Sequence, residues 1–233
     1  MPYRKFVKRL KPRRVARKPW YMKKYSVGQV AQKAWSGLKY IKSLINVEQK
    51  FFDVTRNNSV QTSTATVLNL SNLAQGNDYN NRDGNSILIQ SLLIRYILAG
   101  NVSNSLGDIV RIILFQDNDQ RGVDPTASDL LEDTSTPHLQ MLSPLNHNVG
   151  KRFNVISDKI IPVNSQNTVL ATGPYYKAGK LFKKFSGNHI KYTSTAGADA
   201  SNYEGSLYLM TFSLQSVNGP ALSIQSRLRF TDN

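Results

Sequence analysis

The chain has 233 residues, with 30 Lys and Arg against 15 Asp and Glu, and it contains no cysteine. Without cysteine there is no disulfide framework, no cysteine-based zinc site and no thiol nucleophile. The positive charge is concentrated at one end, because the first 50 residues hold 15 basic residues and one acidic residue, whereas the remainder holds 15 and 14. This split into +14 and +1 predicts a polyanionic partner for the N-terminal segment.

Residues 1–25 form a basic arm, which we expect to be disordered until a polyanion neutralises it. An anionic membrane surface is disfavoured, because Pro2, Pro12 and Pro19 would interrupt an amphipathic helix here. No apolar run reaches transmembrane length, so no membrane partner is predicted. The predicted partner is single-stranded nucleic acid, whose phosphates would bind Arg4, Lys5, Lys8, Arg9, Lys11, Arg13, Arg14, Arg17, Lys18, Lys23 and Lys24.

Five aromatic residues are interleaved with these cations, namely Tyr3, Phe6, Trp20, Tyr21 and Tyr25, and two of them, Trp20 and Tyr21, have two interpretations. They would stack on the exposed bases of a single strand, or they would anchor the arm to the folded domain. In addition, the segment KPRRVARK has the pattern of a nuclear localisation signal. Its basic residues are Lys11, Arg13, Arg14, Arg17 and Lys18.

Residues 26–46 are predicted to form a short amphipathic helix. Apolar side chains recur there at steps of three and four residues, which is the period of one helix face. Ser26 precedes the first of them and is suited to cap the helix N-terminus. The residues of this stripe are Val27, Val30, Ala34, Leu38, Ile41 and Ile45.

Residues 47–233 are predicted to form one β domain, because apolar residues now alternate with a period of two and turn-forming clusters separate the runs. Eight strands are expected, at residues 47–56, 62–70, 86–100, 108–116, 150–163, 180–193, 206–215 and 221–230. Long and uneven connections favour a jelly roll over an up-and-down barrel. The predicted fold class is therefore all-β, an eight-stranded single jelly-roll sandwich preceded by the basic arm and the short helix.

Three features of this domain indicate contacts beyond its core. The segments 86–100 and 108–116 are apolar on both faces, which predicts that an outer sheet face is also covered, for example by another subunit. The connection 117–148 is long, and long loops in compact domains are usually functional. Arg227 and Arg229 lie on the polar face of the last strand, where an interior, an outward and an inter-subunit position all remain open.

Catalytic chemistry is not indicated, and no cofactor is predicted. His138, His147 and His189 lack the spacing of a metal-dependent jelly-roll enzyme, and no nucleophile or phosphate-loop motif occurs. The segment DNDQRG at residues 117–122 resembles a calcium loop, but Arg121 occupies a ligand position, so a tight turn is the preferred interpretation. Asp117 and Asp119, with Asp124, remain candidates for a cation site between subunits.

The layout of basic arm, short helix and β domain resembles that of small viral coat proteins. The resemblance is carried by LKYIKSLINVEQKFFDV (38–54), NSILIQSLLIRYILAGN (85–101) and DIVRIILFQDNDQRGVDP (108–125). These segments look like capsid proteins of small circular single-stranded DNA viruses that encode a rolling-circle replication protein. They are also similar to the single jelly-roll coat proteins of satellite viruses and nanoviruses.

This resemblance implies an icosahedral T=1 shell of 60 subunits whose arms point inward and package single-stranded DNA. It favours DNA over RNA, because a phosphate-binding arm does not itself distinguish the two. It also implies a location in the virion and, during assembly, in the host nucleus, with host nuclear import factors as further partners.

Two other functions are weighed against a coat protein. A cellular nucleic-acid-binding protein with a basic tail should also carry basic residues across its folded domain, whereas residues 51–233 have a net charge of only +1. An enzyme on a jelly-roll scaffold would use the arm only for targeting. The concentration of charge in the arm favours the coat protein.

Overall fold

The structure is a computed structural model of the chain. It describes residues 26–44, 48–103, 107–119, 122–149, 151–165, 175–197 and 202–232. The chain divides into two units, Met1–Asn46 and Val47–Asn233, each of which is described by itself. The predicted phosphate-binding, stacking and nuclear localisation residues of the arm lie outside the described residues.

Helix α1 spans Val27–Leu44, close to the predicted range. Its N-terminus is closed by a capping box, in which the Gln29 N–H donates to Ser26 Oγ (3.3 Å) and the Ser26 N–H donates to Gln29 Oε1 (3.1 Å). Ser26 is therefore the N-cap that the sequence predicts. Within the described ranges, no helix is long and apolar enough to cross a membrane.

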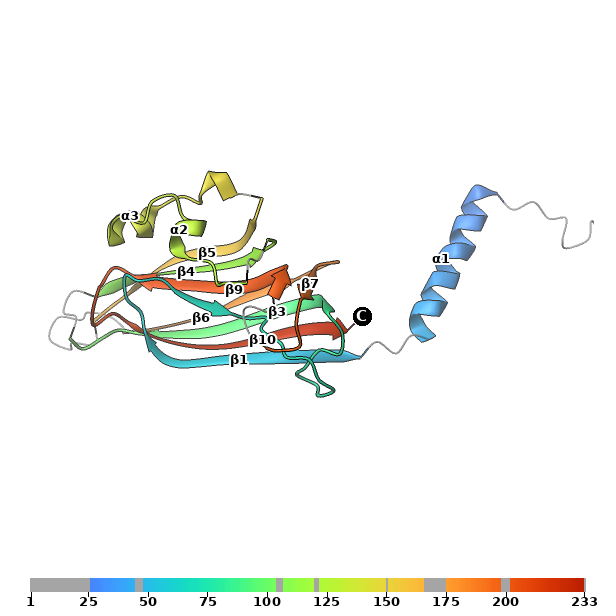
Figure 1. The fold of residues 1–233 in the computed structure, drawn as a ribbon, viewed down its shortest axis with the longest axis horizontal. Helices are drawn as coiled ribbons and strands as arrows, with labels where there is room; N and C mark the ends of the chain where they lie inside the picture. Colours follow the sequence, from blue (N-terminus) through green and yellow to red (C-terminus); the bar gives the residue numbers. More distant parts are fainter. Residues whose placement is uncertain are drawn as a thin grey trace, which may run out of the picture. The chain divides into compact units, whose positions relative to one another are not determined.

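The described part of the β domain contains ten strands in two antiparallel sheets (Figure 1). The first sheet has the order β1-β10-β3-β7-β8, with β6 also paired to β3, and the second has the order β2-β9-β4-β5. The strands are β1 (Gln49–Val60), β2 (Thr66–Asn69), β3 (Ser86–Ala99), β4 (Asp108–Asp117), β5 (Phe153–Val163), β6 (Tyr176–Lys184), β7 (His189–Tyr192), β8 (Asn202–Glu204), β9 (Ser206–Ser213) and β10 (Ala221–Asp232).

The order of the strands is that of a jelly roll. The chain crosses repeatedly between the sheets, so that β1, β3, β6 and β10 lie in the first sheet and β2, β4, β5 and β9 in the second. The predicted jelly-roll sandwich is confirmed. The predicted strand at 180–193 is instead two strands, β6 and β7, separated by a turn in which Gly187 has a φ of +76°. The three-residue strand β8 was not predicted.

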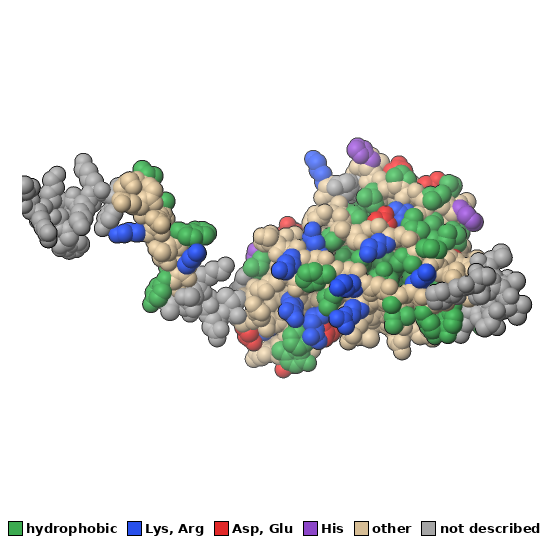
Figure 2. Space-filling view, turned by 180° about the vertical axis from the view of Figure 1, so that it is seen from behind, with side chains coloured by type: hydrophobic (Ala, Val, Ile, Leu, Met, Phe, Trp, Pro, Cys, Tyr) green, Lys and Arg blue, Asp and Glu red, His purple; other side chains and the backbone are tan. Residues whose placement is uncertain are grey.

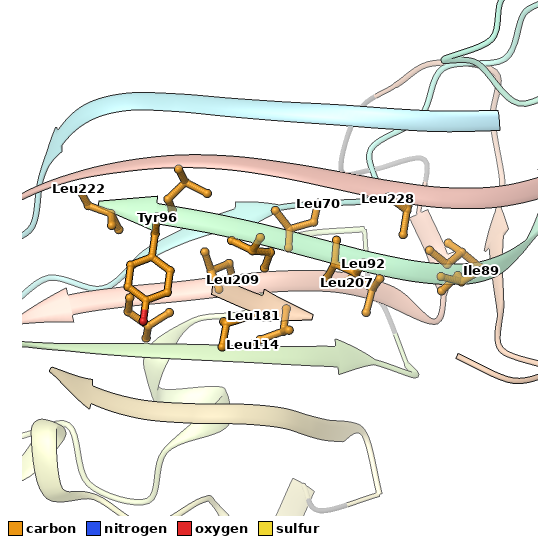
Figure 3. Close-up of a cluster of buried hydrophobic side chains, with 14 of the residues drawn as sticks. Leu70, Ile89, Leu92, Tyr96, Leu114, Leu181, Leu207, Leu209, Leu222 and Leu228 are labelled. Carbon is orange, nitrogen blue, oxygen red and sulfur yellow. The ribbon is translucent and has the colours of Figure 1, made fainter. Parts of the chain in front are cut away.

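The main core lies between the two sheets and is built from inward-facing residues of both. In Figure 3, Leu92 and Leu228 of the first sheet point toward Leu114 and Leu209 of the second. Burying each such leucine is worth roughly 1.5–3 kcal/mol relative to its exposure. Alternation along the strands leaves every second side chain of the first sheet on its outer face.

A second apolar cluster covers the outer face of the second sheet. The segment 122–149 folds over that face with helices α2 (Ala127–Leu130) and α3 (Pro137–Leu142) and the 3₁₀ helix η2 (His147–Val149) (Figure 1). The cluster joins Ile113, Phe115, Phe153, Tyr208, Met210 and Phe212 of the strands to Leu130, Leu131 and Met141 of this segment.

This cluster corrects one prediction from the sequence. β4 is buried on both faces, but its outer face is covered by the chain's own 122–149 segment and not by another subunit. β3 is not buried on both faces, because Arg95 and Ile97 are exposed on its outer side. Runs of apolar residues alone do not distinguish these two cases, because the pattern within a strand does not show which segment covers its outer face.

Arg111 of β4 fastens the 122–149 segment to the sheet. Its guanidinium pairs with Asp158 of β5 (Nη2–Oδ2 2.6 Å, Nε–Oδ1 3.0 Å). Its Nη1 donates to three carbonyl oxygens at the end of α3, those of Gln140, Met141 and Ser143, at 2.9–3.0 Å. Because backbone acceptors at a helix C-terminus lack partners within the helix, the arginine satisfies them where water is excluded.

Candidate nucleic-acid interface

The outer face of the first sheet gathers basic side chains from three strands. In β10, polar residues alternate with buried leucine, isoleucine and phenylalanine, so Arg227 and Arg229 share the outer face. Strand pairing sets Arg227 beside Leu93, which in turn lies beside Phe182 of β6. The same register aligns Arg229, Ser91 and Lys184 in the next row, and Gln225, Arg95 and Lys180 in the row on the other side.

We call this surface the basic face. It is the outer face of β1, β10, β3 and β6, and it carries one carboxylate, Asp53 of β1, so its charge is 5 − 1 = +4. Its five cations are Arg95, Lys180, Lys184, Arg227 and Arg229. Figure 2 shows lysine and arginine side chains gathered on one side of the β domain. Such a concentration of charge favours a polyanion as ligand, because phosphate groups bind basic side chains independently of base sequence.

Two large hollows indent the basic face, and a smaller one of about 260 Å³ is lined among others by Asp53, Arg95 and Arg227. One, of about 830 Å³, is lined among others by Arg95 and Lys180. The second, of about 640 Å³, has Leu93 and Phe182 in its lining and Lys184, Arg227 and Arg229 around it. The face is therefore not a flat charged surface, and it offers depressions with both apolar and cationic groups.

One of the five cations is held by an ion pair within the face. Arg227 binds the Asp53 carboxylate through two hydrogen bonds (Nε–Oδ1 2.8 Å, Nη2–Oδ2 2.6 Å), and its guanidinium lies 4.5 Å from the centre of the Phe51 ring. The hydrogen bonds to Asp53 raise the pKa of Arg227. Because the pair is half exposed, a phosphate in solution can compete with the carboxylate for the guanidinium.

Removing this carboxylate is expected to strengthen nucleic-acid binding. Asp53→Asn leaves Arg227 in place but frees it to bind one further phosphate, which should steepen the slope of log K against log salt by about 0.7 for a single strand. Fluorescence anisotropy with a labelled oligonucleotide over a salt series measures this slope. Glu132→Gln, which removes one exposed carboxylate from the segment over the other sheet, should have no such effect; an equal change in both variants would contradict a role for Arg227.

The opposite side of the β domain is acidic. We call residues 122–149, which cover the second sheet, the acidic cover: this segment contains Asp124, Asp129, Glu132 and Asp133 and has no Lys or Arg. The near-neutral β domain therefore separates a face of +4 from a cover of −4. The net charge of +1 over residues 51–233 conceals this separation, because the two faces cancel in the sum. Only the pairing of Arg227 with Leu93, and of Arg95 with Lys180, brings the cations together.

The candidate cation site at Asp117 is not supported by the structure. The Asp117 side chain is fully buried, and Arg152 binds both its oxygens (Nε–Oδ1 3.0 Å, Nη2–Oδ2 2.8 Å). Hydrogen bonds to this carboxylate raise the pKa of Arg152. Since the arginine supplies the positive charge, a metal ion at Asp117 would be repelled. In the described parts of the chain, no group of three histidine or carboxylate side chains is placed to hold a metal, Asp119 and Asp124 included.

Comparison with known proteins agrees with a viral origin. Residues 24–233 match the family described as the satellite tobacco necrosis virus coat protein. The coat protein of satellite tobacco necrosis virus 2 is 30% identical over 168 residues, covering 70% of this chain and 76% of that protein. The capsid protein of satellite tobacco necrosis virus 1 is 26% identical over 176 residues, covering 74% of this chain and 83% of that protein.

Solved virus structures also align with the chain, at low similarity. The structure of cocksfoot mottle virus aligns with a TM-score of 0.38 and 11% identity over 81% of this chain and 96% of that one. That of desmodium yellow mottle tymovirus aligns with a TM-score of 0.36 and 7% identity over 80% and 87%. The assignment of the chain therefore depends on its sequence relatives and on the strand order described above.

These matches decide between the functions considered from the sequence. A basic surface on the folded domain was expected of a cellular binding protein, and the basic face has that character, so this feature alone does not separate the alternatives. The match of residues 24–233 to a viral coat protein family does separate them, and it favours the coat protein. Coat proteins are structural components of the virion and not enzymes, so the prediction that the chain is not an enzyme is confirmed. The chain belongs to the satellite tobacco necrosis virus coat protein family.

Proposed function

We propose that this coat protein closes into an icosahedral shell and packages single-stranded nucleic acid through residues 1–25 and the basic face together. The observation that carries the proposal is the polarity of the β domain, with +4 on one outer face and −4 on the other. In a closed shell one of these faces is directed to the enclosed genome. Electrostatics favours the basic face on that side and the acidic cover on the outside.

The charge of the N-terminal segment supports the same orientation. A shell of 60 copies, as the resemblance implies, would bring 60 × 14 = 840 positive charges from the first 50 residues. This is enough to neutralise on the order of a thousand phosphates, the scale of a small genome. The basic face would add contacts at fixed positions on the shell wall.

The kind of nucleic acid is left open within the proposal. The likeness to circular single-stranded DNA viruses favoured DNA, but the family match is to satellite tobacco necrosis virus coat proteins and gives that likeness no support. Arginine and lysine bind the phosphates of DNA and RNA alike. Import into the nucleus through Lys11 to Lys18 likewise stays a prediction.

Particles produced in cells that express the full chain test the proposal. We expect negative-stain microscopy to show uniform closed particles, and we expect nucleic acid inside them to survive nuclease treatment. After extraction, its sensitivity to DNase or to RNase identifies which kind is packaged. Protein that remains at single-subunit mass with nucleic acid present, or closed particles that protect none, would overturn the proposal.

A further inference from the structure

An exposed aromatic ring lies in the middle of the basic face. Phe182 of β6 is 58% exposed, although phenylalanine is usually buried. Its neighbours on the same face of β6 are Lys180 and Lys184, because side chains two residues apart share a face. Across the sheet it lies beside Leu93. An apolar ring is thus flanked along its strand by two cations.

Phe182 also lines the hollow of about 640 Å³ described above, which is large enough for a nucleobase. Leu93 contributes an apolar surface beside the ring, and Lys184 and Arg229 lie in the adjacent row of the face. Within the described residues, neither of these two cations forms a salt bridge with a carboxylate. The hollow therefore combines an open ring face with cations about one strand pleat, roughly 6.6 Å, away.

We propose that this hollow binds an unpaired nucleobase stacked on Phe182, with the adjoining phosphates on Lys184 and Arg229. The inference rests on the proposed function and adds a selectivity to it, because the basic face would then prefer unpaired segments of the genome to duplex segments. Stacking on an aromatic side chain requires a base whose π face is open, and this condition is met in single strands, loops and bulges. Any base can stack, so the site does not read sequence.

A second copy of the chain is a less suitable occupant of the hollow. Two basic faces would repel one another, since each carries +4. The acidic cover of another copy has the complementary charge, but two of its four carboxylates already accept hydrogen bonds locally, Asp129 from Thr126 and Asp133 from Ser135. A contact between opposite faces would also stack subunits in layers, whereas a single closed shell joins subunits side by side.

The test compares three variants of the full chain, Phe182→Leu, Phe182→Ala and Phe182→Trp, in binding to an unstructured single-stranded oligonucleotide and to a duplex of equal length. Phosphate contacts of the arm weaken as salt increases, whereas stacking does not. The affinities are therefore measured over a salt series and extrapolated to 1 M salt, where the contribution of stacking can be compared between variants. The Leu and Ala variants should bind the single strand about 5- to 100-fold more weakly, with an unchanged salt slope. The Trp variant should keep the affinity of the natural chain. Duplex affinity should not change. Val217→Ala, an exposed apolar residue of the β9–β10 connection, is the matched control.

Phe182→Leu removes the aromatic ring but keeps an apolar side chain, so it distinguishes stacking from apolar contact. Equal binding of single strands by this variant and the natural chain would overturn the inference, while packaging in the same particles would leave the proposed function standing. Loss of particle assembly with unchanged single-strand affinity would also overturn it, because Phe182 would then be a contact between subunits. A natural chain that binds neither single strands nor duplexes would overturn the proposed function and the inference with it.

Discussion

A chain that starts at Val47 is expected to lose most of the salt dependence of nucleic-acid binding. Residues 1–46 contain 14 basic residues and no acidic one, and the remainder has 16 basic and 15 acidic residues. Each phosphate neutralised on a single strand contributes a slope of about −0.7 to log K against log salt, so removing these residues should reduce the slope by up to about 10. Residues Val47–Asn233 form a compact unit, which makes this truncation suitable for the measurement.

A second truncation separates the arm from α1. A chain starting at Ser26 lacks only the 11 cations of the arm. Its slope of log K against log salt should therefore be smaller than that of the full chain by up to about 8, out of the total reduction of about 10. The remaining difference would come from Lys33, Lys39 and Lys42 of α1. Both slopes are obtained by titrating one labelled single-stranded oligonucleotide at several salt concentrations. A slope that stays the same after removal of residues 1–25 would contradict the assignment of the arm as the main phosphate-binding segment.

Arg111→Met is expected to destabilise the β domain by about 3 kcal/mol. The Arg111 side chain is 6% exposed, and its loss leaves the carbonyl oxygens of Gln140, Met141 and Ser143 without a donor in a site closed to water. Its partner Asp158 is 32% exposed and can be hydrated in part, which keeps the loss below that of a fully buried pair. Urea denaturation of the unassembled subunit measures the change in the free energy of unfolding.

Two controls identify the source of that loss. Asp158→Asn keeps the three bonds from Arg111 to the end of α3 but leaves the buried guanidinium without its counter-charge, and should cost about 2 kcal/mol. Arg111→Lys keeps the charge but not the planar set of donors, so it should fall between the other two. The account would be contradicted if Arg111→Met and Asp158→Asn were equally destabilising, since the carbonyl contacts would then contribute nothing.

The fold could be predicted from the sequence wherever a local pattern determines it. Alternation of apolar residues located the strands that became β9 and β10 to within two residues, and Ser26 as N-cap marked the start of α1. Composition alone located the charge of the arm. These features depend on residues close in sequence, and each has a period or a spacing that can be counted.

The remaining features depend on residues that are far apart in the chain. The connection between the strands expected at 62–70 and 86–100 contains Arg82, which is fully buried and donates to the carbonyl oxygens of Leu73, Gly84 and Ser194. Likewise, the pairing of Asp117 with Arg152 was hidden, because the two residues are 35 positions apart. The basic face required the register of four strands, which no single segment encodes.

Photochemical crosslinking of the packaged nucleic acid tests most directly which surface of the subunit faces the genome. Particles of the full chain would be irradiated, digested with protease and nuclease, and analysed by mass spectrometry for peptides that carry a nucleotide. We predict crosslinks in peptides from residues 1–25 and in those that contain Phe182 or Arg229. Crosslinks concentrated in residues 122–149, with none on β6 or β10, would contradict the account, because the acidic cover would then face the nucleic acid.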